Sequence, residues 1–361
     1  MRERGFEIHI ATSPGSVLYD FARTEGAISH LVPMTRAITP LQDAIALFRL
    51  WRLIRRLHPD AVQTHTPKAG LLGIVAARLV GVSVRVYEVH GLRLETTSGL
   101  KRCILWVAEW IACSLATHVI AVSPSVREEA ARMKLCRPEK SRVLANGSAN
   151  GVDARLRFNP KLIPPQTRRA VRSTIGIPED ALVVGFVGRL VRDKGIPELA
   201  AAWNDLHRRH ARAWLVLVGR FETGDPVPTP VRAALEHAPR VVFCPYTDDI
   251  VPLYTTMDVV VLPTHREGFP NVALECAALE LPIVTTDVTG ARDAVIDGVT
   301  GTLVSPRCPH ALSRAVSAYL NDAQLRSRHG AAARSRVLLD FSRETVWHAV
   351  VDFYRVLTGD P

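Results

Sequence analysis

Two glutamates on either side of a glycine-proline turn form the clearest chemical pattern in this chain. Glu267 and Glu275 are eight positions apart in the segment EGFPNVALE, which follows a strand-like run at Asp258–Pro263. Asn271 can begin a helix and Pro282 ends one, so Glu275 is predicted about one turn into a helix. A helix N-terminus favours an anion, whereas carboxylates accept hydrogen bonds from sugar hydroxyls. The segment therefore predicts a site for a nucleotide sugar.

A second pattern brings two cations into one loop. The segment FVGRLVRDKG places Arg189 and Lys194 after the strand-like run 182–187 and before a predicted helix. Cations at this point can neutralise a diphosphate and stabilise a departing nucleoside diphosphate. Arg192, between them, is predicted to be a solvated side chain without a role.

Histidines follow two predicted strands in the first half of the chain. His90 lies in YEVHG and His65 in QTHTPKAG, and Lys68 comes three residues after His65. A neutral imidazole at a strand end can hydrogen-bond a sugar or an acceptor. His65 and Lys68 are expected at the same sheet edge and are candidate acceptor contacts; loop packing is the alternative for both.

Together these segments resemble the retaining glycosyltransferases of family 4, which have the GT-B fold. The match runs through EGFPN, the second glutamate and PIVTTDVTG, and it includes GRLVRDKG and the strand-end His-Gly. The resemblance implies catalytic roles for His90 and Glu267 and no metal or other cofactor. It also implies that the donor is bound by Arg189, Lys194, Gly268, Phe269, Pro270, Asn271, Val272 and Glu275.

The order of predicted elements is that of an α/β protein. Short β-branched runs alternate with helical ones, which favours parallel sheets, and a turn-rich segment separates two such series. With the resemblance, this predicts two Rossmann-like domains that face a cleft, at 1–165 and 176–340. A C-terminal helix at 341–361 is expected to dock back onto the first domain through its aromatic residues, and an ordinary amphipathic helix of the second domain is the alternative. These aromatic residues are Phe341, Trp347, Phe353 and Tyr354.

The first half also resembles family members that build bacterial capsules, exopolysaccharides and lipid-linked glycans. THTPKAGLLGIVAARLVGVSVRVYEVHG, VIAVSPSV and NGSANGVD carry this likeness. In the family, a strand and a glycine-rich loop precede the segment that resembles RGFEIHI. The first domain is therefore expected to lack its first strand and that loop, which would leave two strands without a partner.

Composition narrows the class of partners. The 361 residues carry 45 basic and 35 acidic side chains, a formal net charge of +10, which favours anionic partners. The six cysteines form no C-x-x-C pair, and the N-terminus has no apolar signal-peptide core, so a cytoplasmic protein is expected.

The apolar stretch 103–122 includes Glu109 and His118 and is predicted as a helix followed by a strand rather than a membrane span. The basic helix at 47–57, with Trp51, is either a peripheral membrane contact or an ordinary Rossmann helix.

The function predicted from the sequence is transfer of a sugar from a nucleoside diphosphate, preferably UDP, to a glycan or polyprenyl-diphosphate acceptor. The acceptor would lie at the inner face of the plasma membrane. Alternatives are a nucleotide-sugar epimerase of the same fold and an inactive nucleotide-binding remnant. A nucleic-acid binder is supported by charge alone.

Overall fold

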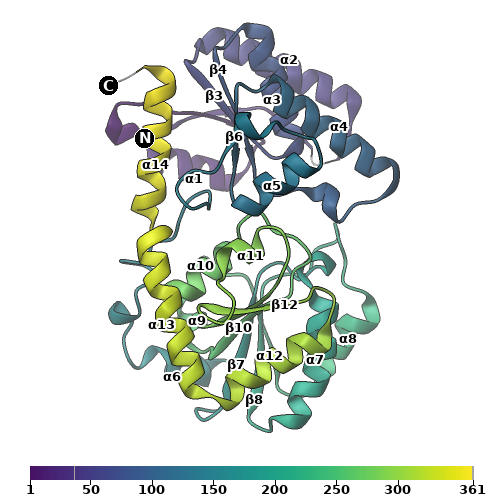
Figure 1. Cartoon of the computed structure of the whole chain (residues 1–361), viewed down its shortest axis with the longest axis vertical. Helices are drawn as coiled ribbons and strands as arrows, with labels where there is room; N and C mark the ends of the chain where they lie inside the picture. The colour runs from purple at the N-terminus through teal and green to yellow at the C-terminus, as the bar shows by residue number, and fades with distance from the viewer. Residues whose placement is uncertain (36, 360–361) are drawn as a thin grey trace. The chain divides into compact units, whose positions relative to one another are not determined.

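The chain forms two compact α/β units, both built on parallel sheets (Figure 1). In this computed structural model, residues 1–35 and 37–359 are described. Unit 1 comprises Met1–Val122, Val126–Leu144 and the chain from Trp347 onward. Unit 2 comprises Ser123–Ser125 and Ala145–Val346, so the turn-rich stretch after residue 144 groups with unit 2.

Unit 2 is built on a six-stranded sheet in which every pairing is parallel. Its strands are β7 (Leu182–Val187), β8 (Ala213–Val218), β9 (Val241–Cys244), β10 (Val259–Leu262), β11 (Ile283–Thr286) and β12 (Gly301–Val304). Its helices are α6 (Thr167–Thr174), α7 (Ile196–Arg209), α8 (Thr229–His237), α9 (Val251–Thr255), α10 (Asn271–Ala278), α11 (Ala291–Ala294), α12 (Pro309–Asn321) and α13 (Ala323–Asp340). The strands are continuous apolar runs because both faces of the sheet are covered, and the four residues of β10 are all buried.

The strand order of this sheet reverses next to β7. The order is β12-β11-β10-β7-β8-β9, so the chain proceeds outward from β7 on one side and returns at β10 on the other. In open α/β sheets, ligands bind at the carboxyl ends of the strands where the order reverses. The loops that follow β7 and β10 are therefore the ones in which a ligand site is expected.

Unit 1 contains two separately paired parallel sheets. The smaller pairs β1 (His9–Thr12) with β2 (Ile28–Leu31), and the larger has the order β3-β4-β5-β6. The strands of the larger sheet are β3 (Ala61–His65), β4 (Val84–Val89), β5 (His118–Ala121) and β6 (Ser141–Arg142). The helices are α1 (Ser16–Glu25), α2 (Pro40–Leu57), α3 (Pro67–Val80), α4 (Gly99–Leu115) and α5 (Pro124–Arg132).

The last helix, α14 (Arg343–Thr358), supplies side chains to unit 1. Phe353 packs edge-on against His118 with ring centres 5.9 Å apart, and the Tyr354 hydroxyl donates to Gln63 Oε1 at 2.7 Å. Of the other aromatics predicted to dock, Phe341 is buried in the core of unit 2 and Trp347 is half exposed. Phe353 and Tyr354 thus link this helix to β5 and β3 of unit 1.

The apolar stretch 103–122 forms most of α4 and the strand β5, as the sequence predicts. In the part of the chain that the structure describes, no helix combines the length and the apolar content needed to span a bilayer.

Candidate active site

The loops after β7 and β10 are joined by backbone contacts. The amide of His265 donates to the carbonyl of Asp193 at 2.8 Å, and the Arg266 guanidinium pairs with the Asp193 carboxylate at 3.2 Å. Gly195 has φ +73°, and a Cβ at this position would lie 1.9 Å from the carbonyl oxygen of Pro263. Only glycine permits this approach, so the sequence Lys194-Gly195 fixes one loop against the other.

This arrangement places Lys194 against Glu267. The ammonium of Lys194 donates to Oε1 of Glu267, and the two side chains are 19% and 11% exposed. A cation and a carboxylate predicted from separate motifs therefore lie together at the point of strand reversal. Both groups form charge-assisted hydrogen bonds, so the ammonium can donate to a phosphate of a ligand and the carboxylate can accept from a hydroxyl.

Arg189 lies at the start of the same loop but has a different partner. Its guanidinium is half exposed and pairs with the carboxylate of Glu222 at 3.0 Å. Arg192 is exposed and pairs with Asp225 at 3.3 Å. Arg189 therefore lies in the predicted loop, but its ion pair is with Glu222 rather than with Glu267.

Glu275 is held by a partner that the sequence did not suggest. It is the fifth residue of α10, and its Oε2 accepts a hydrogen bond of 2.7 Å from the hydroxyl of Tyr254, a fully buried residue of α9. Burial raises the pKa of Glu275 and raises the pKa of Tyr254 well above its ordinary value. The tyrosine orients one carboxylate oxygen of Glu275.

The turn between Glu267 and Glu275 is closed by a second glycine contact. The amide of Glu267 donates to the carbonyl of Thr289 at 3.0 Å. Gly290 has φ +77°, and a Cβ there would lie 2.2 Å from the carbonyl oxygen of Gly268. The segment TG in PIVTTDVTG therefore supports the turn from behind.

The remaining predicted donor residues shape the turn and the start of the helix. Phe269 packs on Phe341 with ring centres 5.0 Å apart, and Val272 packs against the core. Pro270 is the N-cap position, and Asn271 is the exposed first residue of α10. Asn271 makes no side-chain cap, and α10 ends at Ala278, ahead of Pro282.

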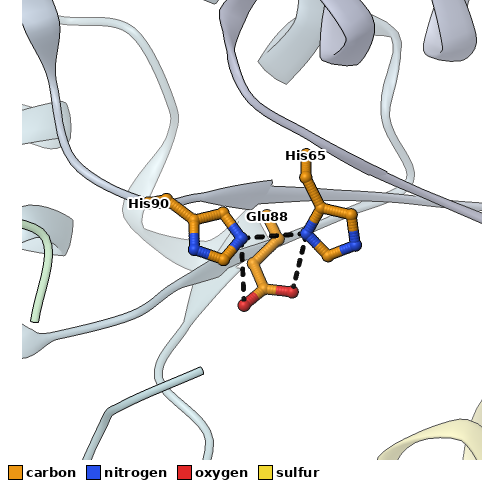
Figure 2. A group of neighbouring side chains, drawn as sticks. All are labelled: His65, Glu88 and His90. Carbon is orange, nitrogen blue, oxygen red and sulfur yellow. Dashed lines mark hydrogen bonds and ion pairs between the residues drawn. The ribbon is translucent and has the colours of Figure 1, made fainter. Parts of the chain in front are cut away.

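In unit 1, the structure brings His65 and His90 together. His65 ends β3, His90 follows β4, and His65 Nδ1 lies 2.9 Å from His90 Nε2 (Figure 2). Between them lies Glu88, a residue that the sequence analysis did not single out, with Oε2 at 3.3 Å from His65 Nδ1. The sequence could have indicated Glu88, because side chains alternate along a strand and residues 88 and 90 therefore lie on the same face as each other.

The environment of this cluster changes its proton affinities. Desolvation and the neighbouring His90 lower the pKa of His65 to about 4, and desolvation also lowers the pKa of His90. Burial raises the pKa of Glu88 to about 7. Both imidazoles are thus neutral at pH 7 and can serve as hydrogen-bond partners for hydroxyls.

Lys68 is directed to a different neighbour. It lies in the first turn of α3, and its ammonium is 2.5 Å from Oδ1 of Asp43 and 3.1 Å from the hydroxyl of Thr35. These contacts tie α3 to the start of α2. The structure therefore joins His65 to His90, and Lys68 to Asp43.

Both units of this chain match known protein families. Residues 1–148 match the family described as Glycosyltransferase Family 4, and residues 167–336 match the family described as Glycosyl transferases group 1. The capsular polysaccharide biosynthesis glycosyltransferase CapM of Staphylococcus aureus is 34% identical over 355 residues, which cover 98% of this chain and 91% of that protein.

A further relative and a solved structure of similar fold extend this likeness. The UDP-Gal:alpha-D-GlcNAc-diphosphoundecaprenol alpha-1,3-galactosyltransferase of Escherichia coli is 25% identical over 304 residues, 83% of this chain and 76% of that protein. The crystal structure of Anabaena Alr3699/HepE in complex with UDP and glucose superposes with a TM-score of 0.80 at 20% identity, covering 96% of this chain and 91% of that one.

Proposed function

Since the chain belongs to the family 4 glycosyltransferases of the GT-B fold, we propose that it is a retaining, metal-independent transferase for bacterial surface polysaccharide. Its donor would be a nucleoside diphosphate sugar, with UDP as the favoured nucleotide. Its acceptor would be a glycan or a sugar on a polyprenyl diphosphate. The observation that carries this proposal is the meeting of Lys194 and Glu267 where the strand order of unit 2 reverses.

The names of two relatives support the choice of substrates. CapM takes part in capsular polysaccharide synthesis, and the Escherichia coli enzyme transfers galactose from UDP-Gal to a diphosphoundecaprenol-linked sugar. A lipid-linked acceptor also agrees with a net charge of +10, which favours an anionic surface.

The residues of unit 2 suit a nucleoside diphosphate. We assign the donor phosphates to Lys194 and Arg189, the ribose hydroxyls to Glu275 and the hexose hydroxyls to Glu267. Cations at the phosphates stabilise the charge that develops as the nucleoside diphosphate departs. This supplies the work that a metal does in other transferases, so the reaction proceeds without one.

The proposed transfer step needs no catalytic base from the protein. The bond between the anomeric carbon and the diphosphate oxygen breaks, and a bond to the acceptor hydroxyl oxygen forms on the same face of the sugar. The proton of that hydroxyl goes to the departing diphosphate. In unit 1, His90 is assigned to hydroxyls of the sugar, and His65 and Lys68 to the acceptor.

Helix α2 is proposed as a peripheral contact with the inner face of the plasma membrane. Leu41, Ile45 and Phe48 are exposed on this helix, and Arg49 and Arg52 are exposed beside them. Trp51, the sequence candidate, is partly buried beneath the guanidinium of Arg55. Phe48, at 58% exposure, is therefore the aromatic better placed for a bilayer.

Incubation with a panel of UDP-sugars, with and without a polyprenyl-diphosphate-linked acceptor, tests the proposal. Transfer predicts a new glycolipid that forms only when the acceptor is present. A free or isomerised sugar released without acceptor would instead identify an epimerase. Binding of UDP without turnover of any sugar would identify a nucleotide-binding protein without activity.

A further inference from the structure

The strands β3 and β4 bring three metal-ligating side chains to one point of unit 1. His65 and Glu88 are partners in the parallel register of the two strands, and His90 lies two residues beyond Glu88. Partners in register and residues two apart on a strand share one face of the sheet. The three side chains therefore converge because of the backbone pairing, and Figure 2 shows both rings turned toward the carboxylate.

The separations of the ligating atoms suit a single small cation. His65 Nδ1 lies 2.9 Å from His90 Nε2 and 3.3 Å from Glu88 Oε2, and His90 Nε2 lies 3.6 Å from Glu88 Oε1. Ligands at about 2.0–2.1 Å in a tetrahedron are separated by about 3.3 Å, the middle of this range. When each residue offers one ligating atom, the three atoms lie within 4.8 Å of one another. One ion can therefore contact all three residues with small shifts.

The carboxylate of Glu88 is oriented by a chain of outer hydrogen bonds. Gln63 Nε2 donates to Glu88 Oε2 at 2.5 Å, and the hydroxyl of Tyr354 donates to Gln63 Oε1 at 2.7 Å. Such partners fix the orientation of metal-ligating carboxylates in known sites. The Glu88 side chain is 9% exposed, whereas those of His65 and His90 are 48% and 38% exposed. The cluster thus has a fixed base and an open side toward solvent.

We propose that His65, Glu88 and His90 form a site for a divalent transition metal of the zinc class, and that the bound ion inhibits sugar transfer. Two imidazoles and one carboxylate with an open fourth position are a ligand set that zinc accepts. The ion would occupy Nε2 of His90 and so remove that nitrogen from hydroxyl binding. This inhibitory role rests on the proposed function, whereas metal binding itself does not.

A second histidine pair in unit 1 provides a matched control. His9 Nδ1 lies 2.8 Å from His30 Nε2, but the carboxylate of Glu7 contacts the opposite ring nitrogen of His9, Nε2, at 2.6 Å. One ion cannot be held by all three residues in this arrangement. The variant His30→Ala therefore disrupts a histidine pair without touching the proposed site.

Calorimetric titration of the full chain with Zn²⁺, after EDTA treatment and buffer exchange, tests the site directly. We expect one binding event that Glu88→Gln weakens by at least about 100-fold and His30→Ala leaves unchanged. Gln63→Leu should weaken it by about 10–100-fold, the usual effect of losing an outer partner. Mg²⁺, which prefers oxygen ligands, should give no such event.

Each alternative outcome of the titration has a definite meaning. Absence of Zn²⁺ binding by the wild type, or equal binding by the wild type and Glu88→Gln, would overturn the site. Thermal melting without metal checks that Glu88→Gln is folded. If it is not, His65→Asn, which changes a half-exposed side chain, provides the same comparison.

The inhibitory role is tested by measuring transfer with and without Zn²⁺ for each protein. We expect Zn²⁺ to inhibit the wild type and His30→Ala, EDTA to reverse the inhibition, and Glu88→Gln to be insensitive. Binding without inhibition would overturn the inhibitory role and leave the site intact. Absence of transfer under every condition would count against the proposed function, while the calorimetry would still decide on the site.

Discussion

Lys194 and Glu267, which are 73 residues apart in the chain, form an ion pair at the carboxyl ends of β7 and β10. Each side chain comes from a loop on one side of the point where the strand order reverses. The backbone contacts of Asp193 with His265 and of Gly195 with Pro263 determine this meeting. The charges are therefore held in place by the fold before a substrate binds.

Replacement of Lys194 should weaken nucleotide binding. We expect Lys194→Ala to raise the dissociation constant for UDP about 10–100-fold, because a hydrogen bond to a charged group contributes about 1.5–3 kcal/mol. Isothermal titration calorimetry measures this change. Arg192→Ala, which removes an exposed cation from the same loop, should change the affinity by less than about threefold. Equal effects of the two substitutions would remove Lys194 from the phosphate site.

Replacement of Glu275 should also weaken UDP binding, without unfolding the protein. Glu275→Gln retains an oxygen that can accept from Tyr254 but loses the charge that strengthens bonds from ribose hydroxyls. We expect an affinity loss of about tenfold or more. Tyr254→Phe keeps the carboxylate and should lose less. Wild-type affinity for UDP in Glu275→Gln would contradict the ribose assignment.

How much of unit 2 follows from the sequence can be seen in its strands. The strand-like run at 182–187 forms β7 and the run Asp258–Pro263 contains β10, because continuous β-branched sequence is typical of a sheet covered on both faces. In unit 1, α1 and β2 were not predicted. The four residues of β2, Ile-Ser-His-Leu, are partly exposed and do not show a buried run.

In the candidate site, too, residues within local motifs were predicted, whereas contacts between distant segments were not. Lys194, Glu267 and Glu275 were predicted because each belongs to a local motif with a recognisable loop. The partners Tyr254 and Glu88 were not, since their roles depend on the neighbouring strand or helix that the fold brings to them. Pairing between distant segments is the information that a single sequence does not display.

Gly290 should be essential for the shape of the turn that carries Glu267. We expect Gly290→Ala to destabilise the protein by several kcal/mol and to impair UDP binding, because its Cβ would lie 2.2 Å from the Gly268 carbonyl oxygen. Gly298→Ala is the matched control, with a similar φ of +69° and no atom within 4 Å of the added Cβ. It should cost only about 1 kcal/mol. Thermal unfolding measures the stability of both variants. Equal stability of Gly290→Ala and Gly298→Ala would contradict the role of Gly290 in the turn.

Glu109 should make the stability of unit 1 depend on pH. It is 1% exposed and accepts from the Tyr87 hydroxyl at 2.7 Å, and burial raises its pKa from 4.5 to about 7. The folded state therefore binds more protons than the unfolded state between these values, so the contribution of Glu109 to stability is fully present below pH 4.5 and is lost as the pH rises toward 7. The shift corresponds to about 3 kcal/mol.

Glu109→Gln removes this titration while keeping an acceptor for Tyr87. The variant should gain stability relative to the wild type as the pH is raised from 5 to 8, as measured by the midpoint of urea unfolding. A difference between the two proteins that does not change with pH would show that Glu109 is ionised in the folded state throughout.

Membrane binding through α2 should depend on both charge and the exposed apolar residues. We expect binding to vesicles with anionic lipid, and a sharp decrease as salt shortens the Debye length from about 10 Å at 0.1 M to about 3 Å at 1 M. Phe48→Ser should weaken the binding, whereas Leu339→Ser, which changes a residue 76% exposed on α13, should not. Equal sedimentation with neutral and anionic vesicles would contradict this role of the helix.

The configuration of the newly formed glycosidic bond, determined by NMR on the product of a UDP-sugar and a polyprenyl-diphosphate-linked acceptor, tests the central claim most directly. The reaction is run in EDTA, with Lys194→Ala alongside the wild type. The account predicts a product that keeps the anomeric configuration of the donor, formed in the absence of divalent metal and strongly reduced in the variant. An inverted linkage, a strict requirement for added metal, or full activity of Lys194→Ala would contradict it.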